Sequence, residues 1–107
     1  LMKVITAIAL LFLSAASWAG EPVWLDVRTP GEFNAGHLEA AINVPHGEVV
    51  DQISSLVEDK NAEIYLYCRS GNRAGIAKRA LESEGYTNVT NVGGLSDARE
   101  KFGAMAE

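Results

Sequence analysis

The stretch AEIYLYCRSGNRAG, from Ala62 to Gly75, joins the most β-like run of the chain to a turn rich in Gly, Ser and Arg. The run from Ala62 to Cys68 is almost continuously apolar, which predicts a central strand that is covered on both faces. A helix from Asn72 to Gly85 is predicted by four apolar residues that share one stripe, Ile76, Ala77, Ala80 and Leu81. The sequence therefore places Cys68, the only cysteine, between a central strand and a helix.

Strands alternate with helices along the rest of the chain. Clusters of β-favouring side chains between turn signals predict three more strands, at residues 22–28, 40–45 and 87–92. Helical spacing and capping signals predict three more helices, at residues 30–35, 47–57 and 96–102. The Gly93–Leu95 segment is expected to form a turn. Because such alternation is typical of parallel sheets, we expect one α/β domain with a small, mainly parallel central sheet flanked by helices on both faces.

Two of these helices carry specific signals. Thr29 precedes Pro30, and Glu32 follows three residues after Thr29, which is the capping-box pattern at a helix start. The helix over residues 47–57 is expected to bury one face, made of Val49, Val50, Ile53, Leu56 and Val57.

Length and composition limit the possible functions. A chain of 107 residues with a formal net charge of −5 has room for one domain. An acidic chain without a stripe of Lys and Arg is not expected to bind nucleic acid. A single cysteine also excludes a disulfide within the chain.

The first residues have the layout of a secretory signal peptide. Lys3 is followed by a ten-residue apolar run and then by small residues that end at Ala19. A membrane anchor is the alternative, but a spanning helix needs about twenty apolar residues. We therefore expect a signal peptide over residues 1–19, cleaved to leave a single exported, periplasmic-type domain over residues 20–107 without stable membrane association.

The turn after Cys68 has the composition of an anion-binding loop. Ligands of open parallel sheets bind beyond the carboxyl ends of the strands, which is where Cys68 is expected. The next five residues allow several backbone N–H groups to converge on one centre, and they are Arg69, Ser70, Gly71, Asn72 and Arg73. Because the positive end of a helix faces the same place, we predict an exposed, nucleophilic thiol with a lowered pKa.

These residues allow three other interpretations. A free cysteine at the end of a core strand is often a buried, inert hydrophobe. A site of the tyrosine-phosphatase type would need Arg where this chain has Ala74, so its loop is one residue too short for phosphate. His37, His46 and Cys68 lack metal-ligand spacing, so no metal is expected and His37 is interpreted as structural.

Three segments in order resemble a single-domain rhodanese of the exported type: LDVRTPGEFNAGHLEAAINVP at residues 25–45, YCRSGNRA at residues 67–74 and VGGL at residues 92–95. The resemblance runs from about Val23 to Leu95. It implies a rhodanese-like fold and a sulfurtransferase in which Cys68 takes the outer sulfur of thiosulfate, releases sulfite and carries a persulfide. A thiol or cyanide would then remove the sulfur, and no cofactor is expected.

The resemblance also implies roles for residues around Cys68. The backbone amides from Arg69 to Arg73 would cradle the persulfide, and either of these two arginines could hold a dianionic donor. Asp26 and Arg28 would support the loop. The chain departs from the family pattern at Ala98, where many rhodaneses carry Trp.

Two functions remain open from the sequence. The first is a monomeric sulfurtransferase with a small anionic sulfur donor and a thiol or cyanide acceptor. The second is a persulfide relay or thiol redox sensor that works with a protein partner and turns over little thiosulfate.

Overall fold

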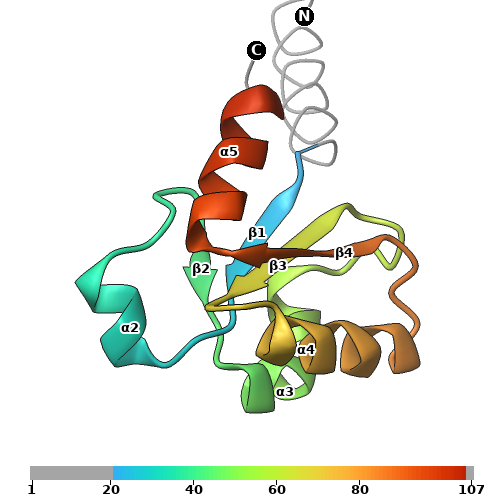
Figure 1. Cartoon of the computed structure of the whole chain (residues 1–107). Helices are drawn as coiled ribbons and strands as arrows, with labels where there is room; N and C mark the ends of the chain where they lie inside the picture. Colours follow the sequence, from blue (N-terminus) through green and yellow to red (C-terminus); the bar gives the residue numbers. More distant parts are fainter. Residues whose placement is uncertain (1–20, 106–107) are drawn as a thin grey trace, which may run out of the picture.

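The computed structural model describes residues 21–105, which form a parallel α/β sheet with helices around it (Figure 1). Four strands lie in the order β2-β1-β3-β4, and all three pairings between neighbours are parallel. The strands are β1 (Val23–Asp26), β2 (Ile42–Asn43), β3 (Ile64–Cys68) and β4 (Val89–Gly94). This confirms the predicted fold class, with β3 as a central strand whose five residues are all buried.

The helices occupy the predicted segments. They are α2 (Pro30–Ala35), α3 (Val49–Leu56), α4 (Asn72–Ser83) and α5 (Leu95–Met105), with a short 3-10 turn, η1 (His46–Glu48), before α3. The capping box of α2 is confirmed, because the Thr29 hydroxyl accepts from the N–H of Glu32 and the Glu32 carboxylate accepts from the N–H of Thr29.

Two apolar layers enclose the sheet. On one face, α3 and α4 pack on alternate residues of the strands, among them Leu25, Leu66 and Cys68. On the other face, α5 packs through Ala98 on a cluster that includes Trp24 and Tyr67. Figure 1 shows α3 and α4 together on one side of the sheet and α5 on the other. Both faces of β3 are therefore covered, which explains its continuously apolar sequence.

Three local expectations were wrong. Val50 is 42% exposed and Ile76 is 47% exposed, because the buried stripes of α3 and α4 follow i, i+3 and i+4 spacings that leave both residues outside. The turn expected at Gly93–Leu95 does not form as such. The strand β4 continues to Gly94, and α5 begins at the next residue.

The predicted signal peptide lies outside the described residues. Within residues 21–105, none of the helices has both the length and the apolar character needed to cross a membrane.

Candidate active site

Cys68 is the last residue of β3 and lies at the carboxyl end of the sheet. Four residues later, the chain enters α4 at Asn72. Asp26 ends β1 beside Tyr67, so the end of β1 reaches the same edge of the sheet. The predicted position of Cys68, between a central strand and a helix, is confirmed.

The loop after Cys68 turns back so that a backbone amide contacts the sulfur. Gly71 has a φ of +99°, a left-handed conformation that favours glycine, and its N–H donates to Sγ of Cys68 at 2.9 Å. Gly71 is also the N-cap of α4 and offers no side chain to the first N–H groups of the helix. Those amides are consequently available to a negative charge at the sulfur.

The electrostatics of the loop favour the thiolate. Burial raises the pKa of Cys68, but the backbone N–H groups of Ala74, Ser70, Gly71 and Arg73 together outweigh it, so that the pKa lies below its ordinary value of 9.0. The predicted direction of the pKa shift is confirmed, and an inert core thiol would show the opposite shift.

The expected exposure of the sulfur is wrong, because Cys68 is only 1% exposed. The residue ends an interior strand and belongs to the same apolar cluster as Leu66 and Ala74. The backbone of β4 also lies close to the loop, because a Cβ added at Gly94 would be only 2.6 Å from the carbonyl oxygen of Arg69. Cys68 is thus both a core residue and a polarised thiol.

The two arginines of the loop differ in their surroundings. Arg73 Nη1 lies 2.7 Å from Glu32 Oε1, and Arg73 Nη2 lies 3.0 Å from Glu32 Oε2. The pKa of Arg73 is raised, chiefly by this hydrogen bonding, and the charge of Cys68 contributes to the rise. Arg69 is exposed, and none of the ion pairs within residues 21–105 includes it. Glu32 is a site residue that sequence reasoning missed, although its place in the capping box was recognised.

Asp26 and Arg28 form a buried ion pair at the end of β1. Arg28 Nη2 lies 2.7 Å from Asp26 Oδ2, while Asp26 is fully buried and Arg28 is 8% exposed. The same guanidinium donates to the carbonyl oxygen of Gly36 at 2.6 Å, and Asn43 Nδ2 donates to the backbone oxygens of Asp26 and Arg28. These contacts fix the segment that leads into α2, and within the described residues no hydrogen bond joins Asp26 or Arg28 directly to residues 69–73.

The remaining residues singled out in the sequence have structural contacts. The ring of His37 stacks on Phe33 with centroids 3.6 Å apart, and its Nδ1 lies 2.7 Å from the carbonyl oxygen of Phe33. The N–H of His46 donates to the carbonyl oxygen of Val27. In the part of the chain that the structure describes, no cluster of three or more His, Cys, Asp or Glu side chains could hold a metal ion.

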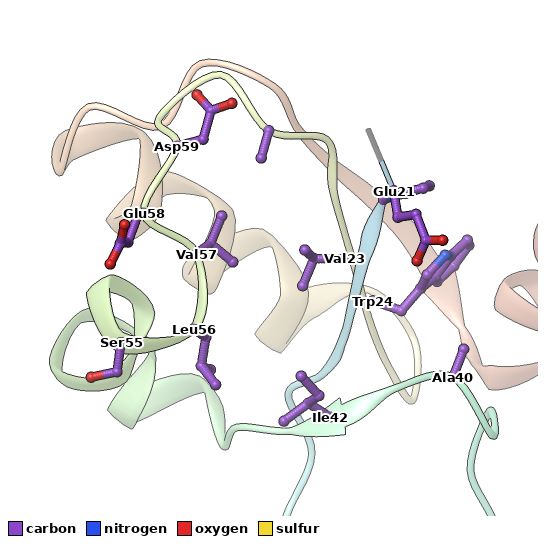
Figure 2. Close-up of a pocket in the computed structure, with 12 residues that line it drawn as sticks. Glu21, Val23, Trp24, Ala40, Ile42, Ser55, Leu56, Val57, Glu58 and Asp59 are labelled. Atoms are coloured by element: carbon purple, nitrogen blue, oxygen red, sulfur yellow. The ribbon is translucent and has the colours of Figure 1, made fainter. Parts of the chain in front are cut away.

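A groove at the opposite end of the sheet is a separate feature (Figure 2). It is bordered by the start of β1, by Ile42 and by residues 55–59, which comprise the end of α3 and the three residues that follow it. Val23 at its edge pairs with Ile64, the first residue of β3, whereas Cys68 is the last residue of that strand. The groove therefore does not include the cysteine site.

Comparisons with known proteins agree with this geometry. A family model described as Rhodanese-like domain matches residues 12–101. The chain is 43% identical over 95 residues to thiosulfate sulfurtransferase PspE of Escherichia coli (strain K12), covering 89% of each chain. It is 35% identical over 79 residues to thiosulfate:glutathione sulfurtransferase of Saccharomyces cerevisiae, covering 64% of this chain and 57% of the yeast protein.

Among solved structures, a rhodanese with anions from E. coli superposes with a TM-score of 0.69 at 43% sequence identity, and the match covers 72% of this chain and 91% of that one. The resemblance that the three sequence motifs indicated is confirmed. The chain belongs to the rhodanese-like family.

Proposed function

We propose that the protein is a thiosulfate-type sulfurtransferase in which Cys68 carries the transferred sulfur. The proposal rests on the environment of Cys68 at the end of β3. Its Sγ accepts a hydrogen bond from the N–H of Gly71 at 2.9 Å, and the pKa of the thiol is lowered. The activities named for the relatives from E. coli and S. cerevisiae support the same reaction class.

In the first half-reaction, the Cys68 thiolate attacks the outer sulfur of thiosulfate. A new S–S bond forms, the S–S bond of thiosulfate breaks, and sulfite leaves with the electron pair. The product is a persulfide anion on Cys68, so the total charge is unchanged. The lowered thiol pKa supports this step, because the attacking species is the thiolate.

The persulfide places its negative charge one atom beyond Sγ, about 2 Å along the new S–S bond. The N–H groups that lower the thiol pKa, including those of Ser70 and Gly71, belong to the loop around that position. Fixed amides stabilise a localised anion without reorganisation, so the loop lowers the free energy of the persulfide anion on Cys68.

In the second half-reaction, an acceptor anion attacks the terminal sulfur of the persulfide. The S–S bond breaks and the thiolate of Cys68 is restored. Cyanide would give thiocyanate, and a thiolate would give a new persulfide on the acceptor.

Arg69 is the proposed contact for the dianionic donor. The guanidinium of Arg73 is already paired in two places with Glu32, which supports a role for Arg73 in holding the loop. Arg69 is exposed beside Cys68 and carries the charge needed to attract sulfite-like oxygens.

We also propose that the enzyme acts outside the cytoplasm. The charged, apolar and small-residue regions over residues 1–19 support export. Cell fractionation with N-terminal sequencing of the mature protein tests this; an uncleaved chain in the cytoplasm would contradict it.

Steady-state release of sulfite from thiosulfate, with cyanide or a small thiol as acceptor, tests the reaction. The parent should turn over and Cys68→Ala should not, although both proteins should be folded and should unfold cooperatively. Turnover retained by Cys68→Ala would overturn the assignment. A parent that accepts sulfur only from a persulfidated protein would instead support the relay function.

A further inference from the structure

Asn91 on β4 connects the cysteine loop to the neighbouring strand. Its side-chain Nδ2 donates to the carbonyl oxygen of Gly71 at 2.9 Å, and its Oδ1 accepts from the backbone N–H of Gly93 at 3.0 Å. One side chain thus holds both the loop and the strand end that lies beside it.

The strand β4 has an irregular register at this place. Leu66 pairs with Asn91 and Cys68 pairs with Gly94. The chain therefore advances by two residues along β3 and by three residues along β4 between these two pairs. An extra residue of this kind is a β-bulge, which bends the strand and redirects the residues around it. Gly93, with a φ of +101°, lies inside the irregular segment, and its N–H is the one that Asn91 accepts. Asn91 therefore stabilises the bend beside the active-site cysteine.

Gly71 is held at both of its backbone polar groups. Its carbonyl oxygen accepts from Asn91 and from the N–H of Gly75, each at 2.9 Å, while its own N–H points to Sγ of Cys68 at the same distance. Gly71 has a left-handed φ of +99°, and because glycine lacks a Cβ it could leave this conformation readily unless other contacts restrain it. The N–H and the carbonyl of Gly71 lie in two peptide planes joined at its Cα, so contacts that fix the carbonyl and the N–H together limit rotation about φ and ψ of Gly71.

We propose that Asn91 is a positioning residue for sulfur transfer, which holds Gly71 in the conformation that aims its N–H at the sulfur of Cys68. The inference rests on the proposed function, since it assigns a role in that reaction. Asn91 does not touch the sulfur and acts through Gly71. The second contact of the Gly71 carbonyl, from Gly75, limits the effect of losing Asn91 to a partial one.

Two variants separate the contacts of Asn91. Asn91→Ala removes both hydrogen bonds. Asn91→Asp keeps an acceptor for the N–H of Gly93 but replaces the amide donor with an oxygen that would face the Gly71 carbonyl. The same two substitutions at Asn88, an exposed residue that precedes β4, are the matched controls.

The primary measurement is the thiol pKa, taken from the pH dependence of the alkylation rate of Cys68 by iodoacetamide. We expect a rise of about half a pKa unit in both Asn91 variants and none in the Asn88 variants, because one hydrogen bond to the anion is weakened. Measurement at about 0.15 M and about 1 M salt separates the added charge of Asn91→Asp, which salt screens, from the lost donor, which persists. In turnover, kcat should fall about threefold while KM for thiosulfate stays unchanged, since the effect lies on the sulfur.

An Asn91→Ala protein with the parent's thiol pKa and kcat would overturn the proposal. If Asn91→Ala melts below the assay temperature, Asn91→Asp decides on the same two quantities at the higher salt concentration. Alkylation requires no sulfur transfer, so it tests Asn91 separately. A parent that takes no sulfur from thiosulfate would overturn the proposed function instead.

Discussion

Glu32 and Arg73 lie 41 residues apart in the chain and form an ion pair with two contacts, at N–O distances of 2.7 and 3.0 Å. Glu32 also accepts from Thr29 in the capping box of α2. The pair therefore ties α2 to the start of α4. It also occupies the guanidinium of Arg73, which supports the proposed role of Arg69 as the contact for the substrate anion.

Replacing Arg69 with Gln should raise KM for thiosulfate about tenfold or more, because a charge-assisted contact to the dianion is lost. The rate of cyanide attack on the preformed persulfide should change much less. Steady-state kinetics and single-turnover decay of the persulfide measure the two quantities. Arg79→Gln, an exposed arginine further along α4, is the control, and equal KM increases in both variants would contradict a specific role for Arg69.

Reactivity should depend on the ionisation of Cys68 and not on that of Glu32. The pKa of Cys68 is lowered, so thiolate reactivity should be present at high pH and should fall as the pH drops through a midpoint below 9.0. Hydrogen bonding from Arg73 and Thr29 lowers the pKa of Glu32 from 4.5 to about 2. The stabilisation from Glu32 is consequently complete above pH 4.5 and is lost progressively as the pH falls from 4.5 to about 2.

Alkylation rates between pH 5 and 10 and thermal unfolding between pH 2 and 10 test this assignment. Above pH 4.5, where the carboxylate of Glu32 is charged in the parent, Glu32→Gln should have a lower melting temperature than the parent. A parent thiol that titrates at or above 9.0 would contradict the account.

Replacing Asp26 with Ala should destabilise the fold by about 3–5 kcal/mol, because Arg28 would remain as a buried charge without its partner. Asp26 is fully buried, and it accepts three side-chain contacts from Arg28 within 3.1 Å. Chemical denaturation measures the loss. The double variant Asp26→Ala with Arg28→Met should recover part of it, and an Asp26→Ala protein as stable as the parent would show that the pair is not needed.

Gly94→Ala should disturb the cysteine loop, because the added Cβ would lie 2.6 Å from the carbonyl oxygen of Arg69. We expect a loss of about 1–3 kcal/mol of stability, together with reduced sulfur transfer. Gly103→Ala is the matched control, since nothing lies within 4 Å of a Cβ there and α5 should gain up to about 1 kcal/mol. Equal activity and stability in Gly94→Ala and the parent would contradict the close approach of β4 to the loop.

Ala98→Trp should destabilise the protein. Ala98 is fully buried in the cluster that contains Trp24, Tyr65 and Tyr67, so large rings already fill this face of the sheet. Overpacking of this kind costs about 1–3 kcal/mol or more. Ala104→Trp, at an exposed position of the same helix, is the control in thermal unfolding. An Ala98→Trp protein with an unchanged melting temperature would show that the cluster has room.

Local signals allowed much of the fold to be predicted. The capping box at Thr29 and the apolar run of β3 are properties of short segments, and both form as expected. Val50 and Ile76 are apolar residues beside the true buried stripes, and composition alone does not separate such positions from core ones.

The site was predicted less completely, because its contacts join distant segments. The turn composition predicted the lowered pKa of Cys68, but the thiol is buried because α4 packs over it in the apolar cluster that contains Leu66 and Ala74. The pairing of Arg73 with Glu32 and the contact between Asn91 and Gly71 span 41 and 20 residues. Spacing along the chain carries no signal for either contact. The paired glycines after Asn91 were the one available sign that two backbones approach closely there.

The intact mass of the purified protein before and after incubation with thiosulfate tests the central claim most directly. The account predicts that the parent gains the mass of one sulfur atom, that cyanide or a small thiol removes it, and that Cys68→Ala gains nothing. A parent that gains no mass while its Cys68 is shown to be reduced and open to alkylation would contradict the account.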